Sequence, residues 1–345
     1  MDTKKQKSSC PPFVTRETPD KGKGQFATRK IKEGEIIMDE HPFLTLKIGT
    51  DFGEFKTKYY PYIDDETKAK VFKLYNRIDN FKNLDPQTLE KMFSKNPALK
   101  GWILASTTEE GKFMNIFSTN SIIMCCVDDP DPCSNSREAG LYNEITVINH
   151  SCLPNVMWSW VKGDVKRQQV RAIKDIEKDE EIVANYHDRI ELNYGSRQFR
   201  REEMLRVSGF WCQCSECSLQ GEENERKRAE IRDKETEIQQ LQRQLDQQLK
   251  DQMMSQGFVF KKPFQKSFQK VMKLAQQRMN LVKELDIRQQ FVFELINFVI
   301  LATDAKKFKI PSPDPSIFKR EALNYAKKQG RCQLYLCNRA FATDY

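Results

Sequence analysis

The sequence lacks the segments that mark a secreted or membrane-spanning protein. Its first residues are polar and lysine-rich, and no apolar stretch typical of a cleavable signal peptide follows them. The most apolar stretch, residues 291–302, is interrupted by Glu294 and Asn297 and is too short to cross a bilayer. We therefore expect a protein of the cytoplasm, the nucleus or both, without a membrane partner.

The sequence also has no large excess of charge of one sign. It holds 57 basic and 49 acidic residues, a net charge of +8 over 345 residues, and the two signs are interspersed. This balance does not favour direct binding of nucleic acid. Hydrophobic residues make up 39% of the chain and aromatic residues 10%. The chain can therefore build packed cores, and its length allows two or three of them.

The first third of the chain changes from polar to strand-like to helical. We expect a flexible polar arm over residues 1–20, strands over 21–44, and a helical insertion over 45–112 that contains no cysteine. In this insertion, Val71, Leu74, Tyr75 and Ile78 share one helical face, and a second helix begins at Asp85-Pro86.

Residues 113–208 return mainly to strand patterns. Strands are predicted at 113–128, 156–161, 165–173 and 181–186, with an exposed loop over 129–139, a hairpin turn at Lys162-Gly163-Asp164, and a helix from Ser196 that ends at Gly209. The mixture of short strands and separate helices predicts an α+β fold.

Residues 222–345 are predicted to form a helical C-terminal domain. The stretch 222–256 is rich in Glu, Gln, Lys and Arg, and its apolar residues have helical spacing, but the coiled-coil register fails at Lys234 and Gln248. We therefore favour an amphipathic helix packed on its own domain over a coiled coil. More helices follow from Pro263, and 289–302 is expected to be the buried one.

Three of the ten cysteines lie within six residues, as Cys212, Cys214 and Cys217. In a reducing compartment such a cluster indicates a metal rather than disulfides, and a structural zinc site needs four ligands. Spacing alone leaves the fourth ligand open among Cys10, Cys125, Cys126, Cys133, Cys152, Cys332 and Cys337. The alternative, three free cysteines on a loop, is the less favoured interpretation.

A dense polar turn, Asn149-His150-Ser151-Cys152-Leu153-Pro154-Asn155, is not explained by core packing. It resembles the signature of SET-domain methyltransferases. Three further segments resemble family motifs in the expected order: Lys21-Gly22-Lys23-Gly24, Asp179 to Tyr186, and Cys212 to Cys217. Asn120-Ser121 before Gly140-Leu141-Tyr142 is closest to the SMYD branch. The resemblance covers about residues 20–220.

The resemblance implies a SET fold of small twisted sheets with a threaded, pseudo-knotted C-terminal segment. The SET domain would comprise an N-terminal part (21–44) and a core (113–208), followed by a zinc-binding post-SET segment (209–220). Its activity would be methyl transfer from S-adenosylmethionine to the side-chain amine of a protein lysine, in a histone or another protein.

The resemblance also implies roles for particular residues. Tyr186 would be catalytic, and Cys152 would be the fourth ligand of a structural zinc ion with the three clustered cysteines. Phe210 would stack near the adenine. The remaining contacts to S-adenosylmethionine would come from Lys21, Gly22, Lys23, Asn120, Thr146, Asn149, His150 and Tyr186.

Three departures from the family pattern point to an alternative function. The insertion 45–112 lacks the cysteines of a MYND zinc finger, Ser208 stands at the position of a second active-site tyrosine, and Ile122 replaces an aromatic wall of the lysine channel. The alternative is a catalytically weak or inactive SET scaffold. It would serve as a protein-interaction or transcription-regulatory module, binding a partner through its 222–345 helices.

Overall fold

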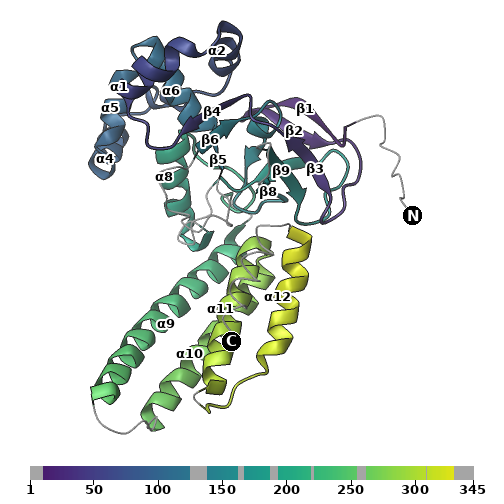
Figure 1. Cartoon of the computed structure of the whole chain (residues 1–345), viewed down its shortest axis with the longest axis vertical. Coiled ribbons are helices and arrows are strands. Elements are labelled where there is room, and N and C mark those ends of the chain that lie inside the picture. The colour runs from purple at the N-terminus through teal and green to yellow at the C-terminus, as the bar shows by residue number, and fades with distance from the viewer. Residues whose placement is uncertain are drawn as a thin grey trace. The chain divides into compact units, whose positions relative to one another are not determined.

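The computed structural model describes residues 11–124, 138–161, 167–186, 193–218, 221–254, 262–307 and 309–329. The chain divides into two compact units (Figure 1). The first consists of Met1–His150, Asn155–Ala184 and Arg201–Cys212, and the second of Ser151–Pro154, Asn185–Arg200 and Gln213–Tyr345.

Three small sheets form the framework of the first unit. One has the strand order β1-β2-β10-β7, and contains β1 (Phe13–Thr18), β2 (Gly22–Ala27), β10 (Glu181–Ala184) and β7 (Asn149–His150). The second is β3-β9-β8, from β3 (Ile36–Glu40), β9 (Arg167–Ala172) and β8 (Val156–Val161). The third is β4-β6-β5, from β4 (Leu44–Lys47), β6 (Glu138–Leu141) and β5 (Ile122–Met124). The predicted α+β fold is confirmed.

A parallel strand pair brings two distant motifs together in the first sheet. β10 pairs with β7 so that Val183 lies opposite Asn149 and Ala184 opposite His150, whereas β10 runs antiparallel to β2. Buried Ile148, Ile182 and Ala184 belong to the core beneath these strands. Asn149 and His150, expected at the start of a polar turn, thus form strand β7, which is fixed to the strand that leads to Tyr186.

The insertion between β4 and β5 is helical, as expected. It contains α1 (Phe52–Glu54), a short π-helix (Phe55–Tyr59), a 3-10 helix (Tyr60–Tyr62), α2 (Asp65–Phe72), α3 (Arg77–Phe81), α4 (Pro86–Lys95), α5 (Ala98–Ala105) and α6 (Glu109–Asn120). Side-chain oxygens of Asp64, Asp85 and Thr108 accept hydrogen bonds from the first turns of α2, α4 and α6. Phe55, Tyr60 and Phe113 form an aromatic cluster at its centre.

Other sequence-based predictions in this unit are also wrong in part. The arm expected over residues 1–20 includes a strand, because Phe13–Thr18 pairs along its whole length with Gly22–Ala27. The strand expected from residue 113 begins only at Ile122, since 113–120 continue the capped helix α6. The single face expected over residues 71–78 is broken, because Asn76 caps a new helix, α3.

Helices dominate the second unit, as expected. Helices α9 (Glu222–Met254), α10 (Lys262–Glu284), α11 (Arg288–Lys307) and α12 (Pro315–Gln329) run side by side, each packed on the next (Figure 1). Their shared core includes Ile231 and Ile238 of α9, which confirms that this helix is amphipathic and packs on its own domain. Among the described residues, no helix has both the length and the hydrophobicity needed to cross a bilayer.

The helix expected to be buried, 289–302, forms most of α11. Its acidic residue, Glu294, is also buried and is neutralised by Arg278 at 2.8 Å. Its second oxygen accepts a hydrogen bond from the Tyr194 hydroxyl at 3.1 Å. A charge that interrupts the apolar pattern is therefore a paired core residue rather than a surface residue.

Several sequence-based predictions lie outside the described residues. They concern residues 129–137 of the exposed loop expected over 129–139, the Lys162-Gly163-Asp164 turn, and Cys10, Cys125, Cys126, Cys133, Cys332 and Cys337. The last two residues of that expected loop, 138 and 139, instead begin strand β6.

Candidate functional site

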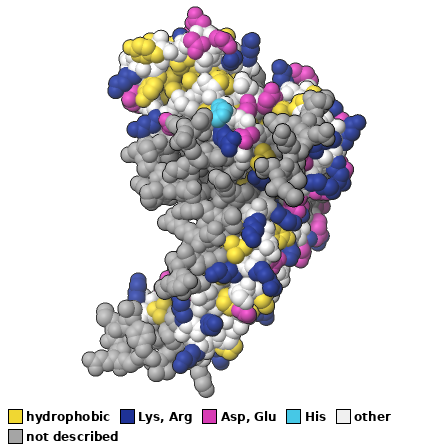
Figure 2. Space-filling model, turned by 45° about the vertical axis from the view of Figure 1, so that its right-hand side comes forward, with side chains coloured by type: hydrophobic (Ala, Val, Ile, Leu, Met, Phe, Trp, Pro, Cys, Tyr) yellow, Lys and Arg dark blue, Asp and Glu magenta, His cyan; other side chains and the backbone are white. Residues whose placement is uncertain are grey.

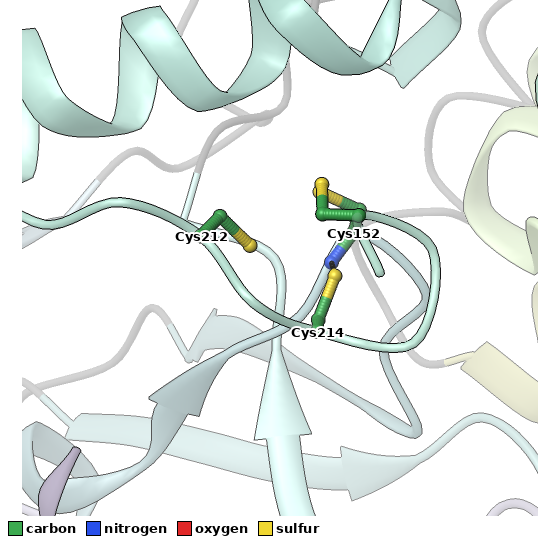
Figure 3. Close-up of side chains that lie close together, drawn as sticks. Cys152, Cys212 and Cys214 are labelled. Atoms are coloured by element: carbon green, nitrogen blue, oxygen red, sulfur yellow. Dashed lines mark hydrogen bonds between the residues drawn. The ribbon is translucent and has the colours of Figure 1, made fainter. Parts of the chain in front are cut away.

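Four buried cysteines come together at one point. The sulfur atoms of Cys152, Cys212, Cys214 and Cys217 all lie within 4.8 Å of one another. Those of Cys152 and Cys217 are 3.6 Å apart, and the backbone N–H of Cys152 points to the Cys214 sulfur at 3.5 Å. Figure 3 shows Cys152 facing the loop that carries Cys212 and Cys214. The four cysteines that the resemblance assigned to one metal are thus adjacent.

The donor set fits a structural zinc ion. Tetrahedral zinc binds thiolates at about 2.3 Å, which places neighbouring sulfurs about 3.8 Å apart. The spacing of the cluster agrees with this geometry, and none of the four cysteines is in a disulfide. Burial favours a structural site, because a catalytic zinc keeps a position open to water or substrate.

A second cluster surrounds Asn149. Its side-chain nitrogen donates hydrogen bonds to the Lys23 carbonyl at 3.0 Å and to a Glu181 carboxylate oxygen at 2.9 Å. The other Glu181 oxygen pairs with Lys21 at 2.6 Å. A Cβ added to Gly24 would lie 2.8 Å from the Asn149 nitrogen, so a side chain at this position would have to displace the Asn149 amide. Both bonds use the amide nitrogen, which leaves the Asn149 side-chain oxygen as an acceptor.

Two expected cofactor residues from distant segments also meet. The His150 and Phe210 rings lie 6.1 Å apart at an angle of 52°. His150 is buried in β7, and Phe210 follows α8 (Arg197–Ser208). The structure therefore brings an aromatic side chain from the segment after α8 to the ring of His150.

The helical insertion braces the turn that leads to Phe210. The Gly209 carbonyl accepts hydrogen bonds from the Tyr75 hydroxyl at 3.1 Å and from Asn80 at 3.0 Å, and Arg77 donates to the Val207 carbonyl at 2.6 Å. Gly209 has φ +78°, and an added Cβ would lie 2.6 Å from that of Arg77. Sequence analysis missed this brace, because its partners are about 130 residues apart and belong to no motif.

The remaining expected cofactor residues have structural partners of their own. The Asn120 side chain donates to the Tyr75 and Ile116 carbonyls, both at 2.7 Å, and Thr146 accepts from the Tyr142 backbone at 3.0 Å. Gly22 begins β2 with φ +70°. Tyr186 follows the end of β10 by two residues and is partly buried. None of these contacts assigns a ligand.

Comparison with known proteins identifies the class. Residues 22–187 match the SET domain model. The histone-lysine N-methyltransferase set5 of Schizosaccharomyces pombe is 24% identical over 217 residues, which cover 63% of this chain and 53% of that protein. The N-lysine methyltransferase SMYD2 of Gallus gallus is 35% identical over 89 residues, covering 26% of this chain and 19% of that protein. The histone-lysine N-methyltransferase ASHR1 of Arabidopsis thaliana is 27% identical over 150 residues, covering 44% and 24%.

Among solved structures, the SET domain of LSMT bound to lysine and AdoHcy aligns with a TM-score of 0.40 and 9% identity over 98% of this chain and 88% of that chain. This score is too low to support an inference, so the assignment rests on sequence. The chain carries a SET domain. It is a homologue of the SET-domain protein-lysine N-methyltransferases, with partial similarity to the SMYD2 and ASHR proteins. It spans about half the length of set5.

Proposed function

We propose that the chain transfers a methyl group from S-adenosylmethionine to the side-chain amine of a protein lysine. The observation that supports this most strongly is the parallel pairing of β7 with β10. It fixes Asn149 and His150 beside the strand that ends two residues before Tyr186, within a matched SET domain.

S-adenosylmethionine supplies an activated methyl group on its sulfonium. Asn149 and His150 would hold it, with contacts from Lys21, Gly22, Lys23, Asn120, Thr146 and Tyr186, and with Phe210 near the adenine. The ring of Phe210 beside His150 and the acceptor oxygen of Asn149 suit an adenine and an amine.

The chain's main task is to orient a neutral lysine amine. The free lysine pKa is about 10.4, and a low-dielectric channel beside a positive sulfonium would lower it, so a strong dedicated base is not required. The Tyr186 hydroxyl would orient the amine, and positioning of this kind supplies much of the rate enhancement in transfer reactions.

The catalytically weak scaffold remains the second candidate, and two buried residues favour it. Ser208, at the expected position of the second tyrosine, is buried at the end of α8, and Ile122 lies in the core of the SET sheets. Neither provides an aromatic wall or a phenol. These positions would also influence how many methyl groups a lysine receives.

We further infer a structural zinc ion held by Cys152, Cys212, Cys214 and Cys217, which would make 209–220 a zinc-binding post-SET segment joined to the residues after β7. Substrates would be lysine-containing proteins, including histones, in the cytoplasm or nucleus. The 222–345 helices would offer a surface to a protein partner.

The test is transfer of labelled methyl groups from S-adenosylmethionine to proteins of a cell lysate, with the acceptor lysines identified by mass spectrometry. We expect labelled bands with the wild-type chain and a loss of at least about tenfold in Tyr186→Phe. Tyr62→Phe, which alters a tyrosine that is 84% exposed, is the matched control and should leave labelling unchanged. Binding of the cofactor without any labelling would reject the enzyme and support the scaffold.

A further inference from the structure

Two arginines are the largest fully buried side chains of the described residues. Both contact the segment Cys212–Cys217, called the metal loop below. Arg200 in α8 and Arg228 in α9 are 2% and 0% exposed. Lysine and arginine are almost never this buried unless they are paired. The groups that pair with Arg200 and Arg228 therefore indicate the role of each buried positive charge.

Arg200 contacts the cysteine cluster directly. One of its terminal nitrogens lies 3.8 Å from the Cys217 sulfur and 3.0 Å from the Glu216 carbonyl. The other donates to the Gly195 carbonyl at 2.7 Å and to Glu225 at 3.1 Å. These four partners fix the guanidinium against one sulfur of the cluster.

Arg228 holds the same loop through Glu216, the residue before Cys217. Its terminal nitrogen lies 2.9 Å from one Glu216 oxygen, and Asn224 donates to the other oxygen at 2.7 Å. Arg228 also donates to the Asn193 carbonyl. The metal loop is thereby anchored to the start of α9.

We propose that Arg200 is a positioning residue of the metal centre, one that stabilises the thiolates by charge and hydrogen bonding. Four thiolates around one zinc ion leave a net charge of −2 in a buried place, and such charge is costly without a compensating partner. Arg200 supplies a permanent positive charge at Cys217. Groups that support metal ligands in this way typically change metal affinity by about 10- to 100-fold.

The proposal rests on the zinc site proposed above and extends it to a residue outside the family motifs. Arg200 contacts no expected cofactor residue in the described hydrogen bonds, so its effect should appear in metal binding before activity. A role limited to packing would be kept by a side chain of similar length without charge.

The experiment measures zinc affinity by competition with a chromophoric chelator, using the whole chain. We expect Arg200→Met to bind zinc at least tenfold more weakly, and Arg200→Lys, which retains the charge, to recover part of the loss. Arg206→Met is the matched control, because Arg206 lies on the same helix and pairs only with Glu203 among the described residues. It should bind zinc as the wild type does.

A second readout separates charge from packing. In the cobalt-substituted protein, we expect Arg200→Met to shift the sulfur-to-cobalt charge-transfer absorption, which a packing defect away from the sulfurs would leave in place. Should Arg200→Met fail to fold, Arg200→Lys must lose zinc to the chelator at least threefold faster than the wild type. Wild-type affinity in Arg200→Met, or a wild-type rate in Arg200→Lys where the first variant fails, would overturn the proposal. A wild-type chain without zinc would instead reject the metal site itself.

Discussion

At the scale of single residues, Glu181 connects the expected cofactor residues. Its two oxygens hold Asn149 and Lys21, while Asn149 also reaches back to the Lys23 carbonyl. The carboxylate thus fixes the orientation of an amide that would contact the ligand. Charge-assisted hydrogen bonds of this kind are among the stronger ones in proteins.

The tight contact at Gly24 gives a direct test of this arrangement. An alanine Cβ would press on the Asn149 nitrogen and the Glu181 oxygen, at 2.8 and 3.0 Å, and displace both. We expect Gly24→Ala to weaken S-adenosylmethionine binding roughly tenfold, which corresponds to about one hydrogen bond. Isothermal titration calorimetry measures the change, and Gly101→Ala, where nothing lies within 4 Å, is the control. Unchanged affinity in Gly24→Ala would argue against a ligand at Asn149.

Sequence alone could predict the residues that belong to motifs, and it could not predict their partners. The four cysteines and the Asn149-His150 turn follow from family patterns, and the structure brings the cysteines together. Arg200 belongs to no motif, and Glu181 lies in the Asp179–Tyr186 motif without an assigned role, because the roles of both residues depend on contacts made only after folding. Their acidic and basic side chains resemble those of ordinary surface residues in the sequence.

At the scale of elements, the sequence-based predictions of secondary structure were wrong where local composition and tertiary pairing disagree. Phe13–Thr18 lacks the alternating burial of a typical strand, with four exposed residues in a row, and forms a strand because β2 pairs with it along its whole length. Residues 113–120 contain β-formers, yet Thr108 caps the segment as a helix that packs into the insertion core. The boundaries drawn for the domains remain predictions.

The helical insertion holds the turn after α8 through hydrogen bonds to the carbonyls of Val207 and Gly209. Gly209→Ala would place a Cβ at φ +78° and against Arg77. We expect a loss of about 2 kcal/mol or more in the free energy of unfolding, since the left-handed conformation alone costs about 1–2 kcal/mol. Urea unfolding measures it. Gly101→Ala in α5, with open space around it, should be neutral or slightly stabilising. Equal stability of the two variants would contradict the brace.

At the scale of the whole molecule, the excess positive charge lies at the C-terminal end. Residues 262–329 hold 14 basic and 6 acidic residues, an excess equal to the net charge of the entire chain. On the face drawn in Figure 2, basic side chains outnumber acidic ones over the lower, C-terminal part. The even mixture expected from composition therefore holds only for the rest of the chain. A negatively charged partner, attracted by this excess of positive charge, would contact α10–α12 first.

Removal of the metal should affect the second unit, because the metal loop is anchored to α9 through Glu216 and Arg228. We expect a strong zinc chelator to lower the melting temperature by at least about 5 °C, since metal-binding free energy is folding free energy. Thermal unfolding followed by circular dichroism measures the shift, and added zinc should reverse it. An unchanged melting temperature after chelation, in protein shown to have lost its zinc, would contradict this coupling.

We propose that a single zinc ion joins Cys152, two residues after strand β7, to the 212–217 segment. X-ray absorption at the zinc edge, combined with elemental analysis of the purified chain, tests it directly. We expect about one zinc per chain, with four sulfur neighbours at about 2.3 Å, and three sulfur neighbours in Cys152→Ser. A chain without zinc, or a wild-type zinc shell with fewer than four sulfurs, would contradict the four-cysteine zinc site.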